Sequence, residues 1–423
     1  MSFSESLKSA DDTRQLSVAD VCQLGLFCAS SFSYAFYMSE LIDSRFYYIS
    51  LGSLVLFCLL RICFIFANRG RSDDALYFSR SAVAFICAAI TFIAISVVIE
   101  FIATSTYTST AMREAMYMIV PIVIAFTVVN TVSIKLADIY VLILLLRYVT
   151  YFAIEFSTDF DISTLTAISW ADSSSSVFES SFSHDLLVLE LYFLFRQQYL
   201  RAGVAMVFAV LTFKRASFLL APTQFIAAKR LRLRNVPAQT SLFALFAVAC
   251  LSPFMMITIY SRPFVDFAAR TFGVDIDEFT TGRRSIYELA IQVSDVNGFG
   301  SLNPELASLA GSTLGTTWNG ALHNDTIRLY IEVGLLGVIV YCAALVYLAR
   351  ASRMSFIAIS YTIFVLVTSR LITHMSFWIV LLLVLALVER LASTGANDNS
   401  AALTKPQLSG AAKRARDKES RSK

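Results

Sequence analysis

The sequence contains few charged residues. Only 15% of its 423 residues are Asp, Glu, Lys or Arg, whereas a soluble domain usually contains about 25%. Hydrophobic residues make up 57% of the chain, and the mean hydropathy is +0.66. This composition excludes an ordinary soluble globular protein and predicts a membrane-embedded protein.

The sequence also lacks cysteine motifs, a signal-peptide pattern and the alternation of membrane β-strands. The seven cysteines form no CxxC pair and lie within apolar stretches, so we expect neither a disulfide framework nor a zinc site. No short basic segment directly precedes the first apolar stretch, so we expect this stretch to remain as a membrane span. The apolar segments also lack the alternation of a barrel, so helices are the expected form.

Apolar stretches of about 20 residues, the length that crosses a bilayer, predict an all-α fold. We expect about twelve membrane segments in a single bundle over residues 1–392, with a long polar loop at 261–323 that carries short helices. Residues 393–423 are polar and basic, which predicts a disordered tail. The segments are expected near residues 19–38, 46–67, 81–101, 114–130, 137–156, 184–200, 202–213, 216–228, 239–260, 325–349, 354–371 and 375–391.

Lysine and arginine in the short loops predict the orientation, because these residues favour the cytoplasmic side. Placing both termini in the cytoplasm leaves few cations in the outer loops, apart from four arginines in the 261–323 loop. The three histidines, His184, His323 and His374, then lie at the outer membrane boundary. The basic residues 229–234 face the cytoplasm, where they suit anionic lipid headgroups better than nucleic acid.

A motif connects the long loop to the next apolar helix. The stretch from Gly298 to Tyr341 reads GFGSLNPELASLAGSTLGTTWNGALHNDTIRLYIEVGLLGVIVY. It places His323 and Asn324 before the helix, then Glu332 and the GLLG sequence Gly334–Gly337 within it.

This motif resembles the O-antigen ligase and polymerase superfamily, whose outer loop ends in a His-Asn or His-Ser pair before a helix with Glu and Gly-Leu-Leu-Gly. Two upstream stretches are similar to that family: GRRSIYELA from Gly282, with an aromatic residue four positions after the Arg, and FKRASFLL from Phe213 at a helix break. The resemblance covers roughly residues 200–350 and implies a metal-independent membrane glycosyltransferase without a cofactor.

The chemistry of sugar transfer from a polyprenyl diphosphate fits these residue types. An imidazole can remove the proton of an acceptor hydroxyl, which makes His323 the candidate base. Guanidinium groups match phosphate oxygens, and the resemblance implies Arg215 and Arg283 as the diphosphate-binding cations. Lys214 and Arg284 are adjacent alternatives for this contact.

Structural interpretations compete with each assignment. His323 could be a polar boundary residue, Arg283 a solvated loop residue, and the Lys214–Arg215 pair could extend its charges outward from two short helices. Glu332 follows Arg328 by four residues, so a structural ion pair is its expected role, with orientation of His323 or an arginine as its functional one. Gly334 and Gly337 are expected at close helix contacts.

Three further charged residues lie within predicted spans: Arg61, Arg147 and Glu190. We expect them either to pair with one another or to line the path of the lipid diphosphate. His184 and His374 are interpreted as plain boundary residues.

The expected activity is polymerisation of polyprenyl-diphosphate-linked oligosaccharide units at the outer face of a bacterial inner membrane. An O-antigen ligase, which transfers finished glycan to the lipid A core, uses the same donor and stays an alternative. A transporter or flippase for the lipid-linked unit is the alternative of another class. Expected partners are the lipid-linked glycan, membrane lipids, and a chain-length regulator and flippase of the same pathway.

Overall fold

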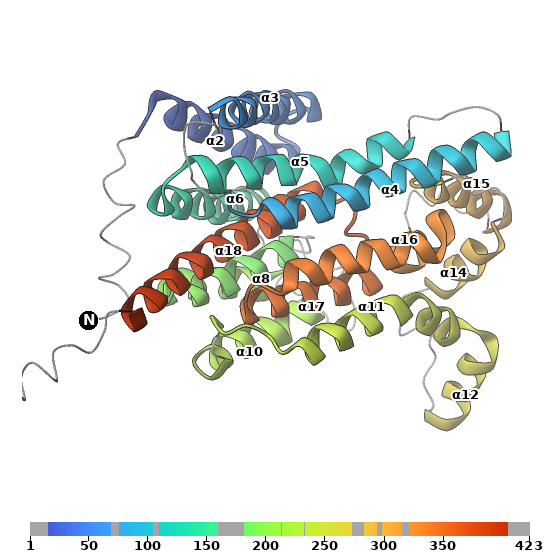
Figure 1. Ribbon diagram of the computed structural model, residues 1–423. Helices are drawn as coiled ribbons and strands as arrows, with labels where there is room; N and C mark the ends of the chain where they lie inside the picture. The colour runs from blue at the N-terminus through green and yellow to red at the C-terminus, as the bar shows by residue number, and fades with distance from the viewer. Residues whose placement is uncertain are drawn as a thin grey trace, which may run out of the picture.

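The computed structural model describes residues 16–68, 76–104, 110–159, 182–212, 214–231, 233–272, 283–293, 298–314 and 322–404. Within these ranges the regular secondary structure is helical throughout, and no strand is present. The long helices run roughly parallel or antiparallel in one elongated bundle (Figure 1). The helices are α2 (Val18–Met38), α3 (Ser44–Asn68), α4 (Ser79–Thr104), α5 (Thr110–Thr131), α6 (Ile134–Asp159), α8 (Phe182–Phe195), α9 (Tyr199–Leu211), α10 (Arg215–Leu231), α11 (Gln239–Tyr260), α12 (Arg262–Phe272), α14 (Arg283–Gln292), α15 (Leu302–Leu314), α16 (Asp325–Ala349), α17 (Arg353–Thr368) and α18 (Met375–Thr404).

Eight helices of the described chain are long and apolar enough to cross a membrane: α2, α3, α4, α5, α6, α11, α16 and α18. The other four predicted segments correspond to the shorter helices α8, α9, α10 and α17. The prediction of an all-helical, membrane-embedded bundle is therefore confirmed, whereas spanning by all twelve segments stays a prediction.

Burial differs strongly between the long helices. In the most apolar stretch of α18, 83% of the residues are buried. Helix α18 is therefore a central helix, and it packs against α5 and α8. In α3 and α11 only 17% is buried, and their outward faces include Phe64 and Phe243, which are 71% and 72% exposed. Such apolar surfaces are compatible with lipid and would be costly in water.

The start of α2 and the end of α18 lie at the same end of the bundle (Figure 1). This arrangement is the one that two termini on one side of a membrane require. Assignment of that side to the cytoplasm stays a prediction.

The predicted loop at 261–323 contains α12, α14 and α15, as expected for a loop with short helices. These helices form a second, smaller core around Tyr260, Tyr287 and Leu302, into which Leu322 and Ile327 also pack. Because Ile327 belongs to α16, this small core fixes the loop to the end of that membrane helix.

Helix α18 continues to Thr404, beyond the predicted end of the membrane domain at residue 392. The segment after Leu391 contains several alanines, which favour helix, and no proline before Pro406. The beginning of the predicted tail is therefore helical, and residues 405–423 lie outside the described chain.

Helix α16 is interrupted at Gly334, whose φ of 69° and ψ of −176° are not helical. A Cβ at Gly334 would meet nothing within 4 Å, so the expected close packing is wrong at this position. Gly334 is instead required by its backbone conformation, which is almost exclusive to glycine. At Gly337, a Cβ would come within 2.3 Å of Val333 Cγ2 in the same helix and 3.6 Å from Phe92 Cε1 in α4, so the tight contact lies within α16 and the contact with α4 is an ordinary one.

We predict that Gly334→Ala lowers the free energy of unfolding by about 1–3 kcal/mol, because alanine cannot adopt this conformation without strain. Thermal unfolding of the detergent-solubilised protein, followed by tryptophan fluorescence, measures the change. Gly52→Ala is the matched control, since Gly52 lies in α3 with open space around it and should tolerate alanine without loss. Equal stability of the two variants would contradict the assigned role of Gly334.

Candidate functional site

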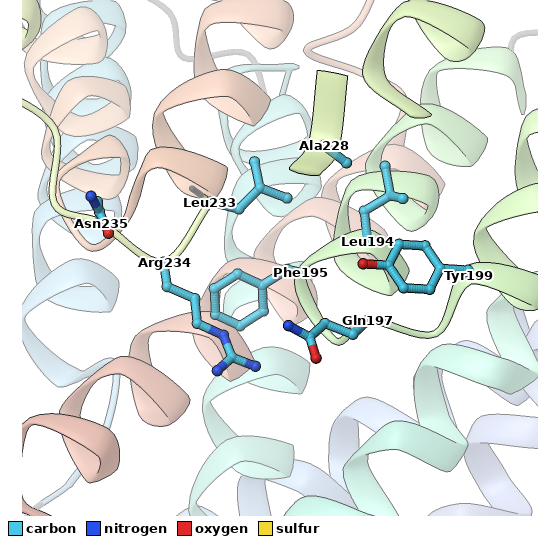
Figure 2. A pocket seen from close by; sticks show the side chains of 8 residues that line it. All are labelled: Leu194, Phe195, Gln197, Tyr199, Ala228, Leu233, Arg234 and Asn235. Carbon is cyan, nitrogen blue, oxygen red and sulfur yellow. The ribbon is translucent and has the colours of Figure 1, made fainter. Parts of the chain in front are cut away.

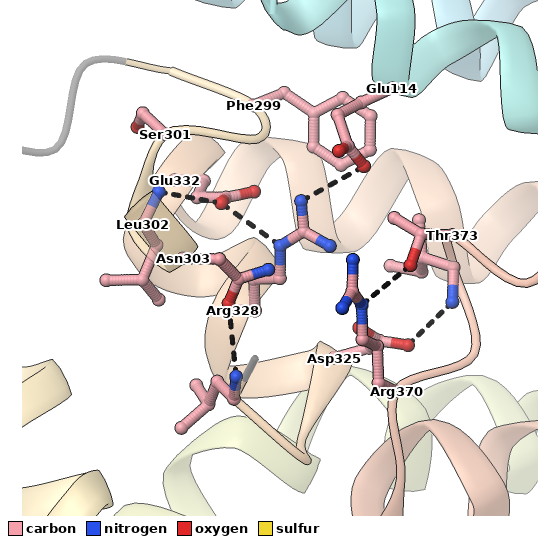
Figure 3. Close-up of polar contacts among 12 residues, drawn as sticks. Glu114, Phe299, Ser301, Leu302, Asn303, Asp325, Arg328, Glu332, Arg370 and Thr373 are labelled. Carbon is pink, nitrogen blue, oxygen red and sulfur yellow. Dashed lines mark hydrogen bonds and ion pairs between the residues drawn. The ribbon is translucent and has the colours of Figure 1, made fainter. Parts of the chain in front are cut away.

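The segment that carries His323 is held in place by three contacts. The Leu322 amide donates to Asn303 Oδ1 at 3.1 Å (Figure 3), and the Tyr287 hydroxyl donates to the His323 carbonyl at 3.0 Å. The Asn324 side chain caps α16 by accepting from the Ile327 amide at 3.0 Å. The backbone of His323 is thus fixed while its side chain is exposed. A fixed backbone with an accessible imidazole suits a reactive group.

Tyr287 connects two of the predicted motifs. It is the aromatic residue four positions after Arg283, and its hydroxyl contacts the residue proposed as base. Helix α14 begins at Arg283, so Arg283 lies about one turn before Tyr287 on the same helix. The side chains of Arg283 and Arg284 lie outside the described part of the chain.

Behind this segment, Arg328 is fully buried between two carboxylates. Its Nε donates to Glu332 Oε1 at 3.0 Å, and its NH2 group donates to Glu114 Oε2 at 3.2 Å (Figure 3). The expected Arg328–Glu332 ion pair is therefore confirmed. Glu332 Oε1 also accepts from the Leu302 amide at 3.1 Å, so Glu332 orients Arg328 and fixes the start of α15.

The chain approaches Glu114 closely at Gly300, in the turn before α15. A Cβ at Gly300 would lie 2.5 Å from Glu114 Cγ, and the φ of 92° at this residue also favours glycine. The neighbouring Phe299 amide donates to Ser96 Oγ in α4 at 2.8 Å. The loop at 261–323 is thus in contact with α4, α5 and α16.

Asp325, the first residue of α16, attaches a second loop. Its Oδ2 accepts from the amides of Leu371 and Ile372, the latter at 2.7 Å. This loop joins α17 to α18 and also contains Arg370 and His374. The contact brings the start of α18 next to the start of α16.

A second buried polar cluster lies where α6, α8 and α18 meet. Arg147 and Tyr148 of α6 contact Asp185 of α8, and Ser376 of α18 donates to Asp185 Oδ2 at 3.0 Å. Arg147 also donates to Ser376 Oγ at 2.9 Å, and its guanidinium carbon lies 5.1 Å from the centre of the Tyr34 ring. We call these residues the Arg147 cluster.

His374 borders the Arg147 cluster. Its Nε2 lies 3.2 Å from the Tyr34 hydroxyl. Burial lowers the pKa of His374; the nearby Asp185 raises it, and the cations Arg147, Lys214 and Arg370 lower it. These four charges therefore act on one imidazole, which the lowered pKa favours in its neutral form near neutral pH.

The predicted helix break at residues 213–215 is present. Helix α9 ends at Leu211, Lys214 is not helical, and α10 begins at Arg215. Lys214 is partly buried and interacts electrostatically with His374, which places it near the Arg147 cluster. The Arg215 side chain lies outside the described part of the chain.

Several sequence-based expectations need correction. His184 is not a plain boundary residue, because it is 5% exposed and its Nδ1 lies 2.6 Å from the Tyr361 hydroxyl. His374, with the partners given above, is not one either. The three buried charges do not pair with one another: Arg61 pairs with Asp20 at 2.8 Å and Arg147 with Asp185 at 3.5 Å, while the Glu190 carboxylate has no hydrogen-bond partner among the described residues.

Asp185 is the site residue that the sequence interpretation missed. It follows His184 at the start of an apolar stretch, where a buried Asp needs a cationic partner. The buried Arg147 was that partner, but pairing residues 38 positions apart requires the packing of α6 against α8.

Both clusters contain buried polar atoms with unused hydrogen-bonding capacity. Within the described residues, such atoms include Asn324 Nδ2, Arg328 NH1 and Glu332 Oε2, together with Asp325 Oδ1 and Asp185 Oδ1. Buried polar atoms are usually satisfied, so this group is unusual. It can receive a polar ligand or water. The described residues form no group of three His, Cys, Asp or Glu side chains suited to a metal ion.

The fold and these clusters define the class of the protein as a polytopic helical membrane protein with buried polar clusters near the starts of α16 and α18. Comparisons with protein-family models, with curated proteins and with solved structures found no match to the chain.

We predict that Arg328→Ala strongly destabilises the fold, by about 3–5 kcal/mol, because it leaves Glu114 and Glu332 as uncompensated buried carboxylates. The control is Arg45→Ala, which removes an exposed ion pair with Asp43 and should change stability little. Thermal unfolding in detergent compares the two. A loss for Arg328→Ala no larger than that of the control would contradict a central role for this ion pair.

Proposed function

We propose that this chain is a membrane glycosyltransferase that polymerises polyprenyl-diphosphate-linked oligosaccharide repeat units into a cell-surface polysaccharide. The observation that supports this most strongly is the hydrogen bond from Tyr287 to the His323 carbonyl. It brings the Gly-Arg-aromatic motif and the His-Asn motif, 36 residues apart in the sequence, into direct contact, as a site that uses both motifs requires.

In this proposal, an acceptor sugar hydroxyl attacks the anomeric carbon of the lipid-linked donor. His323 accepts the hydroxyl proton as the new glycosidic bond forms, and the bond from the anomeric carbon to the diphosphate oxygen breaks. Polyprenyl diphosphate departs with the electron pair. Arg215 and Arg283 balance the charge of the departing diphosphate, and Lys214 and Arg284 are the adjacent cations.

Asn324 and Glu332 are the proposed substrate-binding residues beside Lys214 and Arg284, and their contacts indicate a specific role for each. The Asn324 oxygen is used in capping α16, so its Nδ2, which has no partner among the described residues, is the donor that remains for a substrate hydroxyl that reaches this buried position. Glu332 acts as a positioning residue, because its Oε1 holds both Arg328 and the start of α15. Both residues thereby support the shape of the loop that presents His323.

The proposed location is the bacterial inner membrane, with about twelve membrane segments, both termini in the cytoplasm and the site at the outer face. This orientation rests on the distribution of Lys and Arg in the loops. The proposed partners are the lipid-linked glycan and membrane lipids, with a flippase that supplies the donor and a regulator of chain length.

An O-antigen ligase is the nearest alternative, since it needs the same base and the same diphosphate-binding cations. A transporter for the lipid-linked unit is the alternative from another class. Glu190 favours transport, because it lies in α8 between the Arg147 cluster and the far end of the helix and its carboxylate has no partner among the described residues. The exposed His323 favours transfer.

The experiment that tests the proposal measures the size and attachment of surface glycan in a strain deleted for this gene. Polymerase activity predicts single repeat units on the lipid carrier or on the lipid A core. Full-length polymer that stays on the carrier would indicate a ligase. Absence of repeat units from the outer face would indicate a transporter.

We predict that His323→Ala abolishes glycan transfer while the protein still inserts and folds, because the side chain is exposed and the contact with Tyr287 is made by the His323 carbonyl. Complementation of the deletion strain measures activity, and thermal unfolding verifies the fold. Gln292→Ala, at the exposed end of α14, is the control and should restore normal glycan. Normal polymer from a well-expressed His323→Ala protein would remove His323 as the base.

We predict that Arg215→Ala weakens donor binding or the departure of the diphosphate by at least tenfold, in line with the loss of a charged hydrogen bond. Transfer rates measured against donor concentration show which step changes, and Lys214→Ala in the same assay identifies which of the two cations contacts phosphate. Arg230→Ala, at the exposed opposite end of α10, is the control. Unchanged rate and affinity in both the Lys214 and the Arg215 variants would exclude this helix break from the site.

A further inference from the structure

A second site lies at the other end of α8, away from the Arg147 cluster. Leu194 follows Asp185 by nine residues, which corresponds to about 14 Å along the helix. Here the end of α8, the start of α9, the end of α10 and the segment after it surround a pocket of about 420 Å³ (Figure 2). The lining residues are Leu194, Phe195, Gln197, Tyr199, Ala228, Leu233, Arg234 and Asn235.

The walls of this pocket are fixed by backbone contacts. The Arg353 amide donates to the Asn235 carbonyl at 2.6 Å, and the Met354 amide donates to the Leu233 carbonyl at 3.0 Å. On the opposite side, the Gln198 amide donates to the Phe193 carbonyl at 2.8 Å, which closes the turn after α8. The pocket is therefore formed before any ligand arrives, which lowers the cost of binding.

The pocket combines an apolar wall with a polar, cationic rim. Leu194, Phe195 and Leu233 form the apolar part, while the guanidinium carbon of Arg234 lies 5.7 Å from the centre of the Phe195 ring. Burial lowers the pKa of Arg234, and the nearby charge of Arg196 lowers it further. Arg196 is itself paired with Asp138 at 2.6 Å and does not line the pocket, so the positive potential at the rim comes from Arg234, and this potential attracts an anion.

Exposed apolar side chains follow two of the lining residues in the sequence. Leu200 follows Tyr199 and is 84% exposed, and Val236 follows Asn235 and is 69% exposed. Such side chains next to a cationic pocket suit a ligand that has an anionic head and long apolar chains. A free phosphate ester would use the arginine but would leave this apolar surface uncovered.

We propose that this pocket binds the headgroup of an anionic phospholipid, with the phosphate at Arg234 and the acyl chains along Leu200 and Val236. The Gln197 and Asn235 amides are placed at the rim to bind headgroup oxygens. The site lies at the end of the bundle opposite to the candidate glycan site, and its occupancy does not depend on the proposed transfer reaction.

Native mass spectrometry of the full-length protein, released from an uncharged detergent, tests the proposal with phosphatidylglycerol and phosphatidylcholine of identical acyl chains. Wild type should bind phosphatidylglycerol more tightly. Arg234→Gln should weaken this binding about fivefold, the effect of one cation near an anionic headgroup, and should leave phosphatidylcholine binding unchanged. Arg230→Gln removes an exposed charge outside the pocket and should retain the preference.

Three outcomes would overturn the proposal. Wild type could show no preference between the two lipids, or the two variants could weaken binding equally, which would indicate a diffuse effect of charge. Complete displacement of phosphatidylglycerol by millimolar inorganic phosphate would assign the pocket to a soluble phosphate compound.

A photoreactive phosphatidylglycerol provides a second readout that does not require the Arg234 variant to fold. Crosslinking to wild type should occur within residues 194–200 or 228–236, which surround the pocket. Crosslinks elsewhere, with none in these segments, would contradict the assignment. If surface glycan changes while lipid binding stays normal, the result bears on the proposed glycosyltransferase function and leaves the lipid-binding proposal unchanged.

Discussion

The ion pairs of Arg328 are the interaction on which the rest of the site depends. A fully buried guanidinium is tolerated only with carboxylate partners, and here Glu114 of α5 and Glu332 of α16 supply them. The second carboxylate also binds the start of α15, so one arginine joins two membrane helices and the loop at 261–323. The position of His323 follows from this arrangement, because α15 provides Asn303 and α16 provides the Asn324 cap.

Asp325, near Arg328 in α16, connects this ion-pair network to the loop that carries His374. Its carboxylate accepts from two amides of the loop between α17 and α18, and that loop presents His374 to Lys214, Arg147 and Asp185. Polar groups of α2, α5, α6, α8, α16 and α18 thus gather in two buried clusters, while α3 and α11 carry exposed apolar side chains such as Phe64 and Phe243. A site for a lipid-linked substrate needs this combination, since the lipid requires apolar surface and the diphosphate requires cations.

The sequence predicts the helices well and the site only in part. Apolar stretches identify the helices outside the loop at 261–323, because helices in a membrane must satisfy their own backbone groups. The spacing of Arg328 and Glu332 identifies their ion pair. The partners Glu114 and Asp185 are not predictable in this way, because they depend on which helices pack together. The break at Gly334 was also missed: GLLG suggests close packing, but only backbone angles reveal that Gly334 and Gly337 have different roles.

The most direct test of the central claim is transfer by the purified protein in detergent, supplied only with polyprenyl-diphosphate-linked repeat units. Mass spectrometry of the products measures whether units are joined. The account predicts lipid-linked chains of two or more units, with free polyprenyl diphosphate released in proportion to the bonds formed. Unchanged single units, from a protein shown to be folded and to bind the donor, would contradict it.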